Sequence, residues 1–190
     1  MRIFFTGVPG SRWSGVAQII EEVAGLDTSD RTEEREYNHG EYSGHKGAYF
    51  GAGMEFPAKF GLVDKAHNGE GDKLIKSHEW SYMLDDIIKH FPEDAIILVH
   101  RESFESFKWW KKAGGFDISY PSYAAYKDDL TMMREIHNQN LAIESFCFKN
   151  NIGLVPFSQS WLQENFNASG EGIDFSNYHD VKVAYITWNG

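Results

Sequence analysis

The first 23 residues contain a short apolar strand, a turn with two glycines and the start of a helix, in that order. This order constrains the fold, because a tight turn between a strand and a helix directs several backbone N–H groups and the positive end of the helix dipole at one point. Such a point suits a phosphate or a sulfate. The turn consists of Gly7, Val8, Pro9, Gly10, Ser11, Arg12 and Trp13, and Ser14 begins the helix.

The composition indicates a single globular domain over residues 1–190. Acidic residues outnumber basic ones by 28 to 18, and the net charge of -10 argues against a nonspecific nucleic-acid or anionic-membrane surface. The chain has no run of about 18 apolar residues, so we expect a cytoplasmic, soluble protein without a membrane span or signal peptide. The single cysteine, Cys147, lies between two phenylalanines, where burial is expected.

Strand and helix patterns alternate along the chain, which predicts a three-layer α/β/α sandwich with a mainly parallel sheet. An irregular, glycine-rich insertion at about 27–72 is expected to act as a lid or binding segment, although its tyrosines also suit ordinary packing. Besides the first strand and helix, we expect strands at 73–77, 95–100, 151–157 and 181–186, the last at an edge, and helices at about 81–90, 103–112, 123–149 and 161–166.

In the longest of these helices, seven apolar residues fall on or near one face and are expected to pack into the core. They are Tyr126, Leu130, Met133, Ile136, Leu141, Phe146 and Phe148. On the preceding helix, Trp109 and Trp110 are adjacent and therefore divide between core and surface.

Polar residues follow three of the expected strands, and ligands of parallel sheets bind beyond the carboxyl ends of the strands. The first is the turn itself. The second is Lys76-Ser77-His78, in which an imidazole suits proton abstraction and an ammonium group balances negative charge; an exposed Lys-x-His is the alternative. At the third, Arg101 and Ser103, as a helix cap, would hold an anion, whereas a surface pair of Arg101 with Glu102 or Glu105 is the alternative.

The turn departs from the nucleotide-binding pattern G-x-x-x-x-G-K-[ST] at two positions. Gly7 and Ser14 fit, but Arg12 replaces the second glycine and Trp13 replaces the lysine. An ordinary ATPase or kinase needs that lysine to neutralise the transferring phosphate, so the pattern disfavours one. The Arg12 guanidinium is suited to bidentate bonds with phosphate or sulfate. In the alternative interpretation Pro9 and Gly10 only shape the turn.

The three sites together resemble those of the P-loop sulfotransferase family, over about residues 2–112. That family has a G-x-P-[RK]-S-G-T-T turn, a K-T-H segment after the next strand, and an arginine at the end of an apolar strand. The matching segments here are Gly7-Val8-Pro9-Gly10-Ser11-Arg12-Trp13-Ser14, Lys76-Ser77-His78 and Ile96-Ile97-Leu98-Val99-His100-Arg101. The resemblance implies a P-loop NTPase-like fold and transfer of a sulfuryl group from 3'-phosphoadenosine 5'-phosphosulfate (PAPS) to a hydroxyl or amine.

The resemblance also implies roles for individual residues. His78 would be the general base, Lys76 would lie near the sulfuryl group, and Arg101 would bind the 3'-phosphate of PAPS or of the product 3'-phosphoadenosine 5'-phosphate (PAP). The turn would bind the phosphosulfate through Gly7, Pro9, Gly10, Ser11, Arg12, Trp13 and Ser14, with Arg12 also stabilising the leaving charge. Gly10 stands where the family has a basic residue, and Trp109 where it often has a second ligand of the 3'-phosphate.

Two other functions compete with sulfuryl transfer. One is a nucleoside-monophosphate-kinase type of phosphotransferase, which would require the missing lysine and magnesium. The other is a non-catalytic nucleotide-binding relative. No close spacing of histidines and carboxylates indicates a metal site, so none is expected. The sequence does not specify the acceptor, whether small molecule, glycan or peptide, or the oligomeric state.

Overall fold

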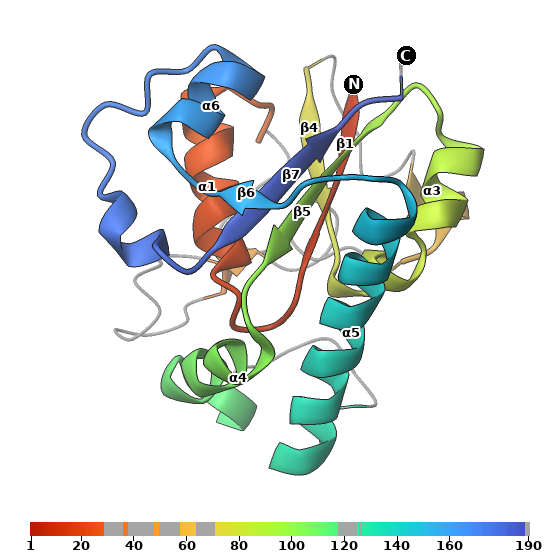
Figure 1. The fold of residues 1–190 in the computed structure, drawn as a ribbon, viewed down its shortest axis with the longest axis vertical. Coiled ribbons are helices and arrows are strands. Elements are labelled where there is room, and N and C mark those ends of the chain that lie inside the picture. Colours follow the sequence, from red (N-terminus) through yellow and green to blue (C-terminus); the bar gives the residue numbers. More distant parts are fainter. Residues whose placement is uncertain are drawn as a thin grey trace.

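A five-stranded sheet with the order β4-β1-β5-β7-β6 forms the centre of the protein (Figure 1). The computed structural model describes residues 1–28, 36–37, 48–49, 58–63, 71–117, 125 and 127–188. The strands are β1 (Arg2–Gly7), β4 (Lys73–Lys76), β5 (Ala95–His100), β6 (Val155–Pro156) and β7 (Lys182–Ile186). β4, β1 and β5 are parallel, whereas β7 runs antiparallel to both β5 and β6.

Helices cover both faces of this sheet, as Figure 1 shows. α1 (Trp13–Val23) and α6 (Gln159–Phe166) pack on one face, and α3 (Leu84–His90) and α5 (Asp129–Lys149) pack on the other. α4 (Ser103–Lys112) follows directly from the carboxyl end of β5. The described residues therefore form a layered α/β fold, as the sequence predicts. The sheet itself is mixed, because β4, β1 and β5 are parallel while both pairings of β7 are antiparallel.

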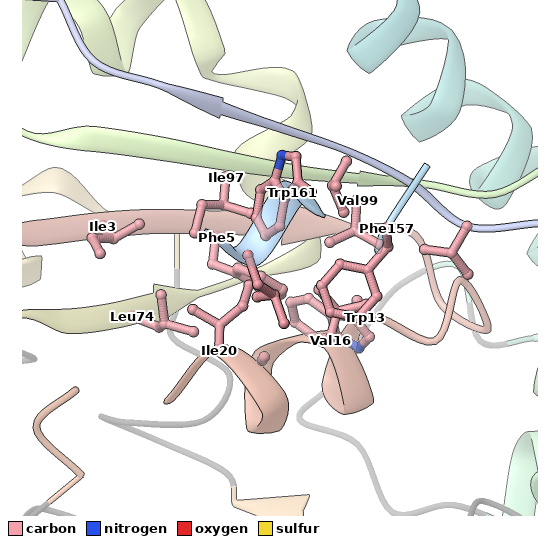
Figure 2. Packing of buried hydrophobic residues seen from close by; sticks show 14 of the residues in the cluster. Ile3, Phe5, Trp13, Val16, Ile20, Leu74, Ile97, Val99, Phe157 and Trp161 are labelled. Atoms are coloured by element: carbon pink, nitrogen blue, oxygen red, sulfur yellow. The ribbon is translucent and has the colours of Figure 1, made fainter. Parts of the chain in front are cut away.

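The strands have apolar residues on both faces because the sheet is buried on both sides. Phe5 and Ile97 point into the cluster beneath α1 and α6, where Trp161 closes the layer (Figure 2). Phe4 and Ile96, one residue earlier on the same strands, point into the opposite cluster with α3 and α5. Two-sided burial explains the uninterrupted apolar run of β5.

The prediction of an edge strand at 181–186 is wrong. β7 lies between β5 and β6, with His100 opposite Lys182 and Val155 opposite Val183. Its residues are buried on both faces, Val183 in one cluster and Ala184 in the other, so the strand is suited to an interior position. The short β6 forms the edge.

Several helix boundaries differ from prediction at the amino-terminal side. The segment expected to begin at about residue 81 is a 3-10 turn, His78–Tyr82, followed by α3. α5 begins at Asp129, where the side chain of Asp128 accepts a hydrogen bond from the Thr131 N–H at 2.8 Å. α6 begins at Gln159 after the capping residue Ser158. Each of these starts is set by a side-chain cap or turn rather than by apolar spacing.

The predicted buried face of α5 is also wrong. Of the six that the structure describes, only Ile136 and Phe146 are buried; Leu130, Leu141 and Phe148 are exposed, Phe148 to 91%. Met133 is half-buried, and Tyr126 lies outside the described residues. The face that contacts the sheet and α4 consists of Met132, Ile136, Gln139, Asn140, Ile143, Phe146 and Cys147.

The insertion at about 27–72 starts and ends at one place. The Asp27 N–H donates to the Asp72 carbonyl at 2.7 Å, which puts the end of the α1 connection beside the start of β4. Within it, β2 (Glu36–Tyr37) pairs antiparallel with β3 (Ala48–Tyr49), and Phe60–Leu62 form a 3-10 turn. The predicted lid falls largely on positions 29–35, 38–47, 50–57 and 64–70, which lie outside the described residues. Across the described part of the chain, none of the helices has the length and apolar character that crossing a membrane requires.

Candidate anion-binding site

The turn between β1 and α1 begins with a type II β-turn. The Ser11 N–H donates to the Val8 carbonyl at 3.0 Å. The two central positions carry Pro9, whose ring presets φ, and Gly10, whose φ of 79° suits glycine. The sequence V-P-G-S therefore determines the local backbone. This part of the turn points towards α4.

Gly10 is required for a second reason, which is close packing against α4. A Cβ at this position would lie 1.9 Å from the Ser106 carbonyl oxygen. No side chain fits there without separating the turn from the helix. This close contact is a physical reason for the glycine at a position where the sulfotransferase pattern that the turn resembles has a basic residue.

Arg12 follows in the left-handed conformation, with φ 64° and ψ 16°, and is the residue that precedes α1. It occupies the position of the pattern's second glycine, and its backbone has the geometry that glycine adopts readily. Its guanidinium carbon lies 3.8 Å from the ring centre of Trp109 and 5.7 Å from that of Tyr178. Burial, followed by the nearby positive charge of Arg101, lowers the pKa of Arg12. Its Nε is buried and has no hydrogen-bond partner.

Ser11 provides a buried hydroxyl inside the turn. Its side chain is fully buried, and its Oγ has no hydrogen-bond partner. The hydroxyl lies 2.9 Å from the position that a Cβ on Gly7 would occupy, so it points back across the turn. Next to it, the first-turn N–H groups of α1, including that of Ser14, have no acceptor within the helix. Helix N–H groups and an unpaired hydroxyl are the donors that bind an anion.

His78 contacts the turn from the end of β4. Its Nδ1 is in contact with the Gly7 carbonyl oxygen, and its ring lies 3.8 Å from the Trp13 ring, centre to centre. A carbonyl oxygen only accepts, so Nδ1 must carry the proton in this contact. In the neutral ring the lone pair then belongs to Nε2. His78 is 1% exposed, so this arrangement is buried.

The Lys76 side chain reaches a carboxylate of α1. Its Nζ lies 3.4 Å from Glu21 Oε1, and both side chains are buried. Lys76 shares a face of β4 with Leu74, which packs beneath α1, and this explains the direction. Glu21 comes eight residues after the first residue of α1, about 12 Å along the helix. The structure thus places the Lys76 ammonium beside Glu21, in the second half of α1.

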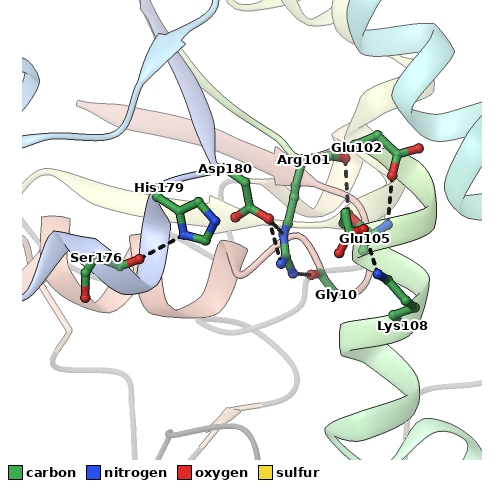
Figure 3. A network of polar contacts seen from close by, with 9 residues as sticks. Gly10, Arg101, Glu102, Glu105, Lys108, Ser176, His179 and Asp180 are labelled. Atoms are coloured by element: carbon green, nitrogen blue, oxygen red, sulfur yellow. Dashed lines mark hydrogen bonds and ion pairs between the residues drawn. The ribbon is translucent and has the colours of Figure 1, made fainter.

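Arg101 contacts the turn and an acidic residue (Figure 3). Its Nε and Nη2 each lie 2.8 Å from Asp180 Oδ2, and its Nη1 donates to the Gly10 carbonyl at 3.3 Å. Its own carbonyl accepts from Ser106 Oγ and Asn140 Nδ2, which fixes the backbone. The alternative pairing of Arg101 with Glu102 or Glu105 is therefore not what the structure shows.

The prediction that Ser103 caps α4 is wrong. The capping residue is Glu102, whose carboxylate accepts from the Glu105 N–H at 2.9 Å. Hydrogen bonds from the backbone N–H groups of Phe104 and Glu105 lower the pKa of Glu102. The Ser103 hydroxyl accepts from Asn140 Nδ2 at 3.0 Å. A carboxylate at this helix start places a negative charge where the sequence interpretation placed an anion.

Sequence reasoning missed the partners of the predicted cations. Asp180 pairs with Arg101, Glu21 pairs with Lys76, and Trp109 and Tyr178 lie against Arg12. One signal was present: Asp180 precedes the last predicted strand. An antiparallel direction for that strand would have placed its start beside the end of β5.

The described residues contain no group of three or more histidine, cysteine, aspartate or glutamate side chains arranged to hold a metal ion. At the site described above, the donors are the Ser11 hydroxyl, the Arg12 guanidinium and the first-turn N–H groups of α1. Comparison with known proteins gave no matching family model, no matching curated protein and no matching solved structure.

Proposed function

We propose that this protein is a PAPS-dependent sulfotransferase that binds the phosphosulfate at the β1–α1 turn. The observation that carries the proposal is that His78 and Arg101, from the ends of two other parallel strands, both contact carbonyls of this turn. They reach it at Gly7 and Gly10, respectively. Polar groups from three strand ends thus lie at one turn, beyond the carboxyl ends of the strands, where ligands of parallel sheets bind.

The 5' end of PAPS fits the donors of the turn. Ser11 Oγ is buried and unpaired, and the N–H groups at the start of α1 lie beside it. In an apolar setting a buried hydroxyl without a partner costs free energy, and an anion oxygen would satisfy it. Arg12 Nε is a further unpaired donor on the same turn. PAPS, when bound, supplies an activated sulfuryl group attached to a phosphate that can leave.

The residues of the chain then have three tasks. His78 takes the proton of the acceptor at Nε2, while its Nδ1–H bond to the Gly7 carbonyl fixes the ring. The first-turn N–H groups and Ser11 orient the anion. Arg12, in its fixed position over Trp109, balances charge that develops on the leaving phosphate. In this scheme Lys76 supports α1 through Glu21.

A thermal-shift series tests this proposal against its rivals. We expect PAP to raise the melting temperature without magnesium, because the donors of the site are protein groups. Stabilisation by ATP that requires magnesium would instead indicate a phosphotransferase. Indifference to PAP and to ATP with magnesium would contradict nucleotide binding altogether.

A non-catalytic nucleotide-binding protein is the second candidate, and one observation favours it. Lys76 and Arg101, two cations expected to act on the cofactor, are each paired with a carboxylate of the chain itself. Such a protein would bind PAP without transferring a sulfuryl group.

Sulfuryl transfer from PAPS to a panel of hydroxyl and amine acceptors separates the two candidates. With an accepted substrate, His78→Ala should abolish turnover while PAP still binds. His137→Ala, a change at an exposed histidine of α5, should leave both unchanged. Turnover by a folded His78→Ala variant would contradict the role of His78 as the base.

A further inference from the structure

We infer that Asp180 determines how strongly this protein binds the 3'-phosphate of a nucleotide. The inference rests on nucleotide binding as proposed above. Arg101, the residue expected to bind that phosphate, already forms two 2.8 Å contacts with Asp180 Oδ2. Figure 3 shows the Asp180 carboxylate and the Gly10 carbonyl on either side of the Arg101 guanidinium.

The Asp180 carboxylate lies on the donors that a phosphate would use. Nε and Nη2 form the side of a guanidinium that binds two oxygens at once, and both point at Asp180. The third nitrogen, Nη1, donates a hydrogen bond to the Gly10 carbonyl. A 3'-phosphate therefore gains full access to Arg101 only if Asp180 turns away.

Charge strengthens this competition. Arg12 lies close enough to interact electrostatically with both Arg101 and Asp180. Two guanidinium groups and one carboxylate leave a single positive charge unbalanced. A 3'-phosphate at Arg101 carries close to two negative charges at neutral pH, whereas the Asp180 carboxylate already balances the single positive charge of Arg101. With Asp180 in place, the phosphate meets a carboxylate at close range, which is unfavourable.

The backbone on either side of Asp180 is anchored, whereas one oxygen of its carboxylate has no hydrogen-bond partner. The Val181 N–H donates to the Tyr178 carbonyl at 2.9 Å, and the Phe157 N–H donates to the Val181 carbonyl at 3.0 Å, so the backbone around Asp180 is anchored. Its second carboxylate oxygen, Oδ1, is buried and has no hydrogen-bond partner. Asp180 is therefore a positioned counter-charge to Arg101 that is held mainly by Arg101 itself.

Two nucleotides that differ only in the 3'-phosphate test this inference. PAP and adenosine 5'-phosphate are titrated by calorimetry into the full chain and into Asp180→Asn, at one ionic strength. We expect Asp180→Asn to bind PAP about tenfold more tightly than the wild type, with an unchanged affinity for adenosine 5'-phosphate. Asparagine keeps an oxygen for Arg101, and circular dichroism checks its folding. Asp180→Ser serves as a second, smaller variant.

Glu171→Gln is the matched control, because it removes one exposed negative charge from the segment that leads to Asp180. It should change neither affinity. An equal change for both nucleotides, an unchanged PAP affinity, or weaker PAP binding in folded Asp180 variants would overturn the inference and leave the proposed function standing. If neither the wild type nor any variant binds either nucleotide, the proposed function fails together with the inference.

Discussion

The guanidinium carbon of Arg12 lies 3.8 Å from the ring centre of Trp109, while the backbone of Arg12 has a φ of 64°. The side chain thus packs on an aromatic face at the cost of an unfavourable backbone conformation. Strained residues of this kind gather at functional sites, where the surrounding structure holds them. Substitution can therefore separate the effect of the guanidinium contact with Trp109 from the effect of the left-handed backbone at Arg12.

Arg12→Gly should be more stable than Arg12→Ala by about 1 kcal/mol, because both lose the contact with Trp109 and only glycine accepts the left-handed backbone without cost. Urea unfolding of the two variants measures the difference. Both should bind PAP more weakly than the wild type, since both lack the guanidinium. Equal stability of the two variants would show that the backbone at Arg12 is not strained.

Gly10→Ala should lower the free energy of unfolding by at least about 2 kcal/mol more than Gly172→Ala. The two glycines have similar φ values, 79° and 82°. A Cβ on Gly10 would lie 1.9 Å from the Ser106 carbonyl oxygen, whereas one on Gly172 has no neighbour within 4 Å. The backbone cost is therefore shared, and the difference in urea unfolding isolates the contact with α4. Similar losses would mean that α4 moves aside easily.

Lys76→Met should destabilise the protein by about 3 kcal/mol, because it removes the ammonium group from a buried carboxylate. The double variant with Glu21→Gln should lose less than the sum of the two single changes. Lys149→Met, which removes an exposed ion pair with Asp85, is the control and should have little effect. Additive losses at 76 and 21 would argue that the 3.4 Å pair is not coupled.

The Cys147 thiol should be unreactive in the folded protein. Burial raises the pKa of Cys147 from 9.0 to about 11, with a smaller contribution from Glu144. The reactive thiolate is therefore scarce at pH 8.5, and a disulfide reagent should label the protein slowly until urea is added. Since the pKa is higher in the folded state, this group contributes stability that is complete below pH 9 and is lost as the pH rises towards 11. Fast labelling of the native protein would contradict its burial.

Parts of the fold were predictable because local signals are sufficient there. β5 coincides with the apolar run 95–100, since burial on both faces leaves no polar position. α4 coincides with residues 103–112, because Gly114 and Gly115, both with positive φ, terminate it. By contrast, a two-residue period does not specify the direction of a strand. The antiparallel run of β7 was therefore missed, and with it the pairing of Arg101 and Asp180.

The buried face of α5 was mispredicted for a related reason. Its core side includes Gln139 and Asn140, polar residues that an apolar count excludes. Asn140 is buried because its amide donates to the Arg101 carbonyl and to Ser103 Oγ, both supplied by another element. The predicted site residues of the turn and His78 lie together, as strand order suggests. The carboxylates that pair with Arg101 and Lys76 lie 79 and 55 residues away in sequence, so these two pairings could not be predicted from local patterns.

The hydrogen bond from the Asp27 N–H to the Asp72 carbonyl makes the geometry of the sheet independent of the length of the segment between these residues. Whatever chain joins these two residues leaves and returns at one point, so its length does not alter the register of β1 with β4. Doubling a loop closed in this way costs only about 0.6 kcal/mol of chain entropy. A longer or shorter segment between Asp27 and Asp72 should therefore leave both the sheet and the turn at Gly7 to Ser14 in place.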